Sequence, residues 1–225
     1  MSLGMYLIYF AILLIVPIWA QSRVKSTYRK YSKIPTSTQM TGAQVARKIL
    51  DDNALYDVRI EEVKGVLTDH YDPRKKVVRL SSGNFHGHSM AATAVAAHEV
   101  GHAIQHAEEY MYLKFRTSLL PAASFGSGSA FYIIFAGLIF NMSGLLLLGI
   151  IFMSFAVLFQ LVTLPVEFNA SSRAMTQLVS TGIIQNNEER ETKKVLDAAA
   201  LTYVAAAMVA VAELLRFILI FLSRD

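Results

Sequence analysis

The sequence contains no cysteine among its 225 residues. Disulfide bonds and thiolate metal ligands are therefore excluded, and any bound metal must be held by histidine and carboxylate side chains. Charge is also missing from long stretches, because Leu3–Ala20 and the 50 positions between Arg116 and Glu167 carry none. Hydrophobic residues make up 54% of the chain, and the mean hydropathy is +0.40. This composition favours a small soluble part joined to membrane spans over an ordinary soluble domain.

The apolar segments predict about four transmembrane helices. A bilayer core of about 30 Å needs about 20 apolar residues, so the long uncharged stretch is enough for two spans joined by a turn at residues 141–144. Gly126 and Gly128 should let these two spans pack closely. The predicted spans are Leu3–Ala20, Leu119–Phe140, Leu145–Pro165 and Ala198–Leu222. Glu213 and Arg216 interrupt the last span, and we expect a structural ion pair that faces the helix bundle.

Basic residues follow the first predicted span at Arg23, Lys25, Arg29, Lys30 and Lys33. Positive charge beside a span indicates the cytoplasmic side, so the N-terminus should lie outside. The net charge of +4 and the isoelectric point of about 9.2 could also suggest nucleic-acid binding. Because the basic residues cluster beside apolar spans, we expect the lipid bilayer as a partner and no nucleic acid.

The chain divides into five predicted parts: an anchor at 1–22, a catalytic domain at 23–118, a transmembrane hairpin at 119–166, a helical segment at 167–200 and a final span at 201–225. In the catalytic domain, Thr41 is placed to cap a helix that ends near Asp52, and Ser89 is placed to cap the helix that carries the central motif. Two short strands, Val58–Val63 and Lys76–Leu80, are expected around a turn at Asp72–Pro73. The second strand is either an edge that pairs with an extended peptide or part of a plain hairpin.

The central motif is His98-Glu99-Val100-Gly101-His102, an H-E-x-x-H pattern within the alanine-rich stretch 91–106. Alanine favours a helix, and residues four apart share one helix face, so both imidazoles can bind one ion. Zinc suits this donor set, with Glu99 as the base for a zinc-activated water. Gly101 lets another element approach the metal side closely. The competing interpretation is a helix that carries the pentapeptide by coincidence.

A third protein ligand is required, and several residues compete for that role. His106 lies eight residues from His98, about 12 Å along a helix, which is too far for one ion. A pattern extended by G-x-x-H is rejected because positions 105 and 108 hold glutamine and glutamate. Glu167 is the strongest candidate, since it follows the transmembrane hairpin on the catalytic side. His86 and His88 are the alternatives.

Three stretches carry a resemblance to a known family: HYDPRKKVVRLS at His70–Ser81, AVAAHEVGHAIQH at Ala94–His106 and LPVEFNASSRA at Leu164–Ala174. With these, nearly the whole chain resembles the YugP family of bacterial membrane zinc metallopeptidases. It is similar, more distantly, to HtpX and the CAAX prenyl endopeptidases.

The resemblance implies a gluzincin-like peptidase in which His98, His102 and Glu167 bind Zn²⁺ and Glu99 is the general base. The expected fold is mostly α and integral to the membrane, with a small α+β zincin-like catalytic domain at the cytoplasmic face of the bacterial inner (plasma) membrane. Expected partners are a peptide or protein substrate, including membrane proteins, and other proteins of the membrane. Ser171 stands where the HtpX-like pattern has an aspartate, so a hydroxyl or another group must orient the ligands.

The sequence leaves two further points open. The residues considered as donors to a developing oxyanion are Arg173, His86, His88, Tyr110 and Tyr112. Arg173 is equally explained as a salt-bridging surface residue. A membrane scaffold or adaptor that holds zinc for structure alone is the alternative function, although structural sites usually fill all four positions with protein ligands.

Overall fold

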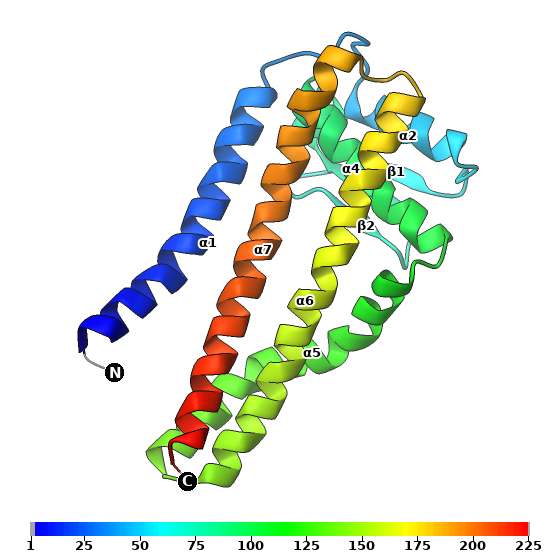
Figure 1. Cartoon of the computed structure of the whole chain (residues 1–225). Coiled ribbons are helices and arrows are strands. Elements are labelled where there is room, and N and C mark those ends of the chain that lie inside the picture. The colour runs from blue at the N-terminus through cyan, green and yellow to red at the C-terminus, as the bar shows by residue number, and fades with distance from the viewer. Residues whose placement is uncertain (1–2, 225) are drawn as a thin grey trace. The chain divides into compact units, whose positions relative to one another are not determined.

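The computed structural model describes residues 3–224, apart from the side chain of Asn186, and its elements are labelled in Figure 1. In chain order they are α1 (Leu3–Tyr31), α2 (Gly42–Asp52), β1 (Arg59–Val63), β2 (His70–Asp72), β3 (Val77–Ser81), α3 (Ser82–Phe85), α4 (Met90–Ala107), α5 (Met111–Ile139), α6 (Ser143–Ser180) and α7 (Asn186–Leu222). The chain forms two compact units. One comprises residues 3–17, 111–166 and 203–224, and the other comprises 18–110 and 167–202.

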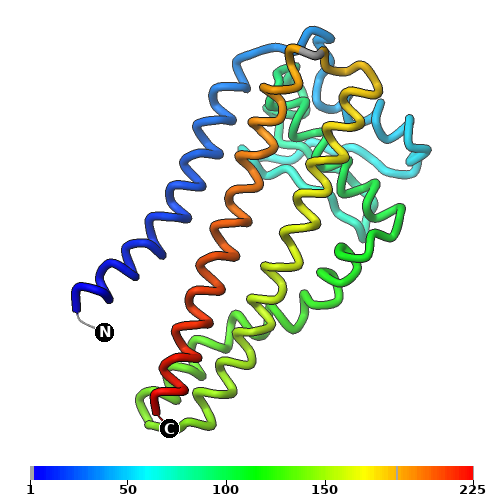
Figure 2. The backbone as a smooth tube through the Cα atoms, in the orientation of Figure 1, coloured from blue at the N-terminus to red at the C-terminus, as the bar shows by residue number. Residues whose placement is uncertain are grey.

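Four helices are long and apolar enough to cross a membrane, which confirms the prediction of a mostly α membrane protein. They are Leu3–Tyr31, Met111–Ile139, Ser143–Ser180 and Asn187–Leu222. Each helix begins before or ends after the apolar span that the sequence predicts for it. Figure 2 shows α6 and α7 as unbroken helices, and Pro165 lies inside α6 although it lacks a backbone donor.

Glycine permits a close approach between α5 and α6 in the first unit. A Cβ atom on Gly126 would lie 2.5 Å from the Phe152 carbonyl oxygen, so this position requires glycine. At Gly128 a Cβ atom would have nothing within 4 Å. Close packing is therefore confirmed at Gly126, and the same expectation for Gly128 is wrong.

The charges in the last span are paired, as predicted. Arg216 forms an ion pair with Glu213 one helical turn away. The Tyr9 hydroxyl of α1 donates to the other carboxylate oxygen of Glu213 at 2.8 Å, and the Arg216 guanidinium lies over the Phe217 ring. Both charges therefore have partners that offset part of the cost of placing them in an apolar helix.

The second unit packs helices α2 and α4 against a three-stranded sheet of order β1-β3-β2. Helix α2 begins as predicted, because Thr41 and Gln44 form a reciprocal capping box. Its residues Val45, Ile49 and Leu50 are fully buried against α4 and the sheet. This core holds α4 rigidly in place.

The strand order contradicts the interpretation of the strand before the motif as a free sheet edge. β3 pairs with β1 in parallel and with β2 in antiparallel, so it lies in the centre and offers no free edge. The sequence pattern did not predict β2, whose three residues are joined to β3 by the turn after Asp72. The Asp72 carboxylate accepts from the backbone of Arg74 and Lys75 in that turn. The hairpin therefore consists of β2 and β3, and β1 pairs with the opposite edge of β3.

Candidate metal centre

Helix α4 presents the two motif histidines on one face. Ser89 caps the helix, as predicted, by accepting from the Ala92 backbone at 3.2 Å. Nearly every other side of α4 is buried, so the helix cannot rotate about its axis without exposing its alanine-rich core. The rings of His98 and His102 lie 4.8 Å apart, and both side chains are 13% exposed. The motif therefore gives two imidazoles directed at one point.

Helix α6 brings Glu167 to the same point by an unusually close contact with α4. A Cβ atom on Gly101 would lie 2.6 Å from the Ala170 carbonyl oxygen, so only glycine permits this approach. Ala170 is three residues beyond Glu167, which places both on neighbouring turns of α6. The close approach expected at Gly101 is confirmed, and the approaching element is the helix that carries Glu167.

The donor atoms have the spacing of a zinc site. Glu167 Oε2 lies 3.3 Å from His98 Nε2 and 3.5 Å from His102 Nε2, and the three ligand atoms all lie within 4.8 Å of one another. Zinc bonds of 2.0–2.2 Å in tetrahedral geometry separate neighbouring donors by about 3.4 Å. Two imidazole nitrogens and a carboxylate oxygen also form a usual catalytic zinc set. The residues therefore fit a zinc ion with an open fourth position.

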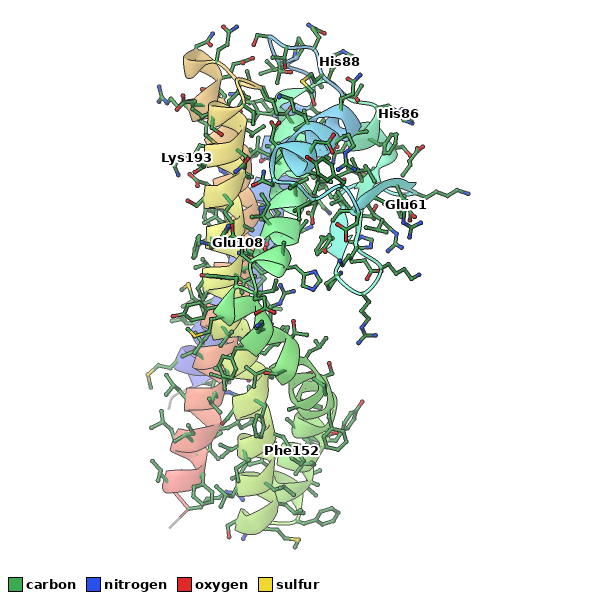
Figure 3. All side chains as sticks on the ribbon, turned by 90° about the vertical axis from the view of Figure 1, so that its right-hand side faces the viewer. Glu61, His86, His88, Glu108, Phe152 and Lys193 are labelled. Carbon is green, nitrogen blue, oxygen red and sulfur yellow. The ribbon has the colours of Figure 1, made fainter. Side chains whose placement is uncertain are left out.

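The other histidines lie elsewhere. Within the described part of the chain, the group at His98 is the one cluster of three or more potential ligands. His86 bonds to Glu62 at the exposed side of the sheet, and Figure 3 shows it with His88 at the end of α4 opposite Glu108. His106 Nδ1 lies 2.9 Å from the Tyr71 hydroxyl, outside the cluster, as its spacing predicts.

Glu99 is buried, with 8% of its surface exposed, beside the metal cluster. Burial raises the pKa of its carboxyl group, while the charges of His98 and His102 act in the opposite direction. Burial by itself would lower the pKa of His102, but the hydrogen bond to Glu167 and the negative charge of that carboxylate outweigh this effect and raise it. Glu167 is thus part of the donor set, whereas Glu99 lies beside it.

The second nitrogen of each motif imidazole has its own partner. Ser171 Oγ lies 3.2 Å from His98 Nδ1, so the hydroxyl takes the place of the aspartate that is absent here. Gln105 Oε1 lies 3.0 Å from His102 Nδ1. Sequence reasoning missed Gln105 and its partner Asn169, although a glutamine one turn after His102 on a buried helix face was an available signal. Metal-binding histidines usually have such partners, which orient the ring.

Of the proposed oxyanion donors, Arg173 is engaged elsewhere. Its Nη2 atom forms an ion pair with Glu108 at 2.7 Å, its Nε atom donates to Asn169 Oδ1 at 2.7 Å, and its guanidinium lies over the Tyr110 ring. The salt-bridge interpretation of Arg173 is therefore the one that the contacts favour. Tyr112 belongs to α5, in the other compact unit.

Comparison with known proteins adds independent information. A family model described as "Putative neutral zinc metallopeptidase" matches residues 6–222. The chain is also 56% identical over 205 residues to the protein described as "Putative membrane protease YugP" from Bacillus subtilis (strain 168), and the match covers 91% of each chain. No solved structure matches.

Proposed function

The chain belongs to the zinc metallopeptidase family whose model it matches, and on this premise we propose that it is a membrane zinc endopeptidase with its active site at His98, Glu99, His102 and Glu167. The observation that carries the proposal is the donor cluster, in which Glu167 Oε2 lies 3.3 and 3.5 Å from the two imidazole nitrogens. The base of the H-E-x-x-H motif lies beside these donors, where hydrolysis requires it.

In this proposal each residue of the cluster has a distinct task. His98, His102 and Glu167 would hold the metal from two helices. A zinc ion bound there would lower the pKa of a water molecule to about 7 and polarise the scissile carbonyl group. Glu99 accepts the proton of the attacking water and then donates a proton to the leaving amine. Its burial keeps bulk water from competing for that proton.

Glu167 is the third ligand in preference to His86 or His88. Its carboxylate is 4% exposed and lies between the two imidazole nitrogens, whereas His86 is 66% exposed and pairs with Glu62. A site with three protein ligands leaves one position for water, which is the arrangement of catalytic zinc. This supports hydrolysis over a purely structural zinc site, in which protein ligands usually occupy all four positions.

The substrates in this proposal are peptide bonds of proteins in or near the membrane. The unit that carries the metal cluster is continuous with four apolar helices that are long enough to cross a membrane. The proposed active site therefore belongs to a membrane-anchored protein. Exposed basic residues follow the first apolar segment, which supports a multi-pass protein of the bacterial inner membrane with an external N-terminus and a cytoplasmic active site. Other membrane proteins are its proposed partners.

The test measures metal content and cleavage on the same preparations. Detergent-purified wild type should contain about one zinc per chain and cleave an unfolded reporter protein. Glu167→Ala should lose the metal and the activity. Glu99→Gln should keep the metal and lose most cleavage, because general acid-base catalysis contributes about 10²- to 10⁴-fold to the rate.

Glu188→Gln is the matched control, since Glu188 is also buried but accepts from the Ser37 and Gln185 backbones, away from the metal cluster. It should bind zinc and cleave as wild type does. Near-normal cleavage by Glu99→Gln would refute the proposed mechanism. A wild type that retains zinc but cleaves no reporter would instead support the scaffold alternative.

A further inference from the structure

Helix α1 continues from its apolar segment into a basic segment whose orientation is fixed by the second unit. Tyr31 is buried in the core of that unit, and its hydroxyl donates to the Glu191 carboxylate of α7. The Tyr28 hydroxyl donates to Asn84 Oδ1 of α3 at 2.9 Å. Ala20, two to three helical turns earlier, is fully buried. These contacts prevent rotation of α1 about its axis, so the other side of this segment points away from the unit.

The outward side of the segment carries the basic residues. The side chains that are buried or half-buried recur at positions 20, 24, 27, 28 and 31, which is the spacing of one helix face. The basic residues fall between these positions, and all of them are exposed: Arg23, Lys25, Arg29 and Lys30 on the helix, and Lys33 just after its end. We call these five residues the basic face of α1.

The basic face has no counter-charge within the protein. The sequence contains no acidic residue before Asp51. In the part of the chain that the structure describes, none of the five cations forms an ion pair, and Lys30 lies over the Tyr31 ring. The carboxylate that does reach this helix, that of Glu191, pairs with Lys194. Five positive charges are therefore available to a partner outside the chain.

Distance along the helix places this face beside the headgroup layer of a membrane. Trp19 ends the apolar segment, is 56% exposed, and is of the residue type that favours the membrane interface. At 1.5 Å per residue, Arg23 lies about 6 Å and Arg29 about 15 Å beyond it. The polar layer is about 5–7 Å thick on each side of a bilayer, and charge acts over about 8 Å more. The nearer cations thus reach headgroups directly, and the farther ones attract them through the solution.

We propose that the basic face of α1 binds anionic phospholipid headgroups and concentrates these lipids around the first span. Each lysine or arginine near a negatively charged surface contributes an attraction equivalent to about a fivefold gain in binding. The apolar part of the same helix favours lipid over other anions, because only 6% of its candidate span is buried in the protein. Lipid headgroups are therefore the anions next to Arg23 and Lys25. This proposal rests on membrane insertion and does not depend on zinc binding or cleavage.

The test uses Trp19, the one tryptophan of the sequence, which lies one helical turn before Arg23. The full chain is reconstituted in phosphatidylcholine vesicles that contain an equal fraction of either brominated phosphatidylglycerol or brominated phosphatidylcholine, since bromine quenches tryptophan fluorescence at contact. Wild type should be quenched more strongly by the anionic lipid, with a local enrichment of about fivefold. Raising the salt concentration from about 0.1 to about 1 M should reduce this preference, because the screening length falls from about 10 to about 3 Å.

Neutral variants test whether the basic face causes the preference. The fourfold variant should be quenched equally by both lipids while it retains the zinc content of wild type, which shows that it is folded. It combines Arg23→Gln, Lys25→Gln, Arg29→Gln and Lys30→Gln. If it fails to bind zinc, the double variant Arg23→Gln, Lys25→Gln takes its place and should lose part of the preference. Equal quenching of wild type by the two lipids, or an undiminished preference in the folded variant, would overturn the proposal.

The matched control removes four positive charges of the same unit that are already paired with carboxylates. It combines Lys48→Gln, Lys76→Gln, Lys193→Gln and Lys194→Gln. This control should keep the preference of wild type, and its loss would show that net charge and not the basic face of α1 is responsible. Inorganic phosphate should weaken the preference no more than chloride at equal ionic strength; a larger effect would assign the face to free phosphate and overturn the proposal.

Discussion

Gly101→Ala should separate metal binding from folding stability. The added Cβ atom would lie 2.6 Å from the Ala170 carbonyl oxygen, and an ordinary contact of that kind begins at 3.4 Å. Helices α4 and α6 must therefore move apart by about 0.8 Å at this point. The nearest ligands on the two helices, His102 and Glu167, lie one residue and three residues from the contact. The displacement consequently acts almost directly on the distances between the donors.

The magnitudes predict a larger effect on zinc than on stability. Zinc sites tolerate deviations of about 0.2 Å in their ligand distances, so a displacement of about 0.8 Å should greatly weaken binding. Overpacking typically costs about 1–3 kcal/mol, but alanine gains about 1 kcal/mol over glycine inside a helix. The metal-free variant should thus lose at most about 2 kcal/mol and still fold.

The assay compares zinc affinity and thermal unfolding of Gly101→Ala with those of Gly128→Ala. Gly128 is also a helical glycine, but an added Cβ atom there meets nothing within 4 Å. Gly128→Ala should bind zinc as wild type does and melt at the same temperature or higher. Wild-type zinc affinity in Gly101→Ala would refute the argument that the contact between α4 and α6 sets the geometry of the site.

Three further predictions concern the ligands, the cap of α4 and the metal itself. The double variant His86→Ala, His88→Ala should retain zinc in a metal-content measurement, because neither residue belongs to the donor cluster; loss of zinc would reopen the choice of the third ligand. Ser89→Ala should lower the free energy of unfolding by about 0.5–2 kcal/mol through loss of the α4 cap, and unchanged denaturation would contradict the capping role. Removal of zinc by a chelator should lower the melting temperature reversibly, since free zinc at 100 times its dissociation constant stabilises the folded state by about 2.7 kcal/mol. A melting temperature that is the same with and without zinc would argue against a metal site in the folded protein.

The sequence by itself determined the features that depend on local spacing or on composition. The absence of cysteine limited the ligands to histidine and carboxylate, and the four-residue spacing of His98 and His102 placed both on one helix face. The apolar stretches predicted four long helices, and Thr41 and Ser89 marked helix starts that the structure confirms. Each of these follows from composition or from residues that lie close together in the chain, so the sequence alone is enough to predict it.

Only the tertiary structure decided which distant residues meet. The sequence left Glu167 in competition with His86 and His88, and the approach of α6 to Gly101 is what brings Glu167 to the imidazoles. Strand order was likewise invisible, because the pairing of β3 depends on contacts with both β1 and β2. The hydrogen bond from Gln105 to Asn169 likewise joins two helices through residues that are 64 positions apart in the chain. Such contacts depend on how helices and strands pack, and local periodicity carries no information about that packing.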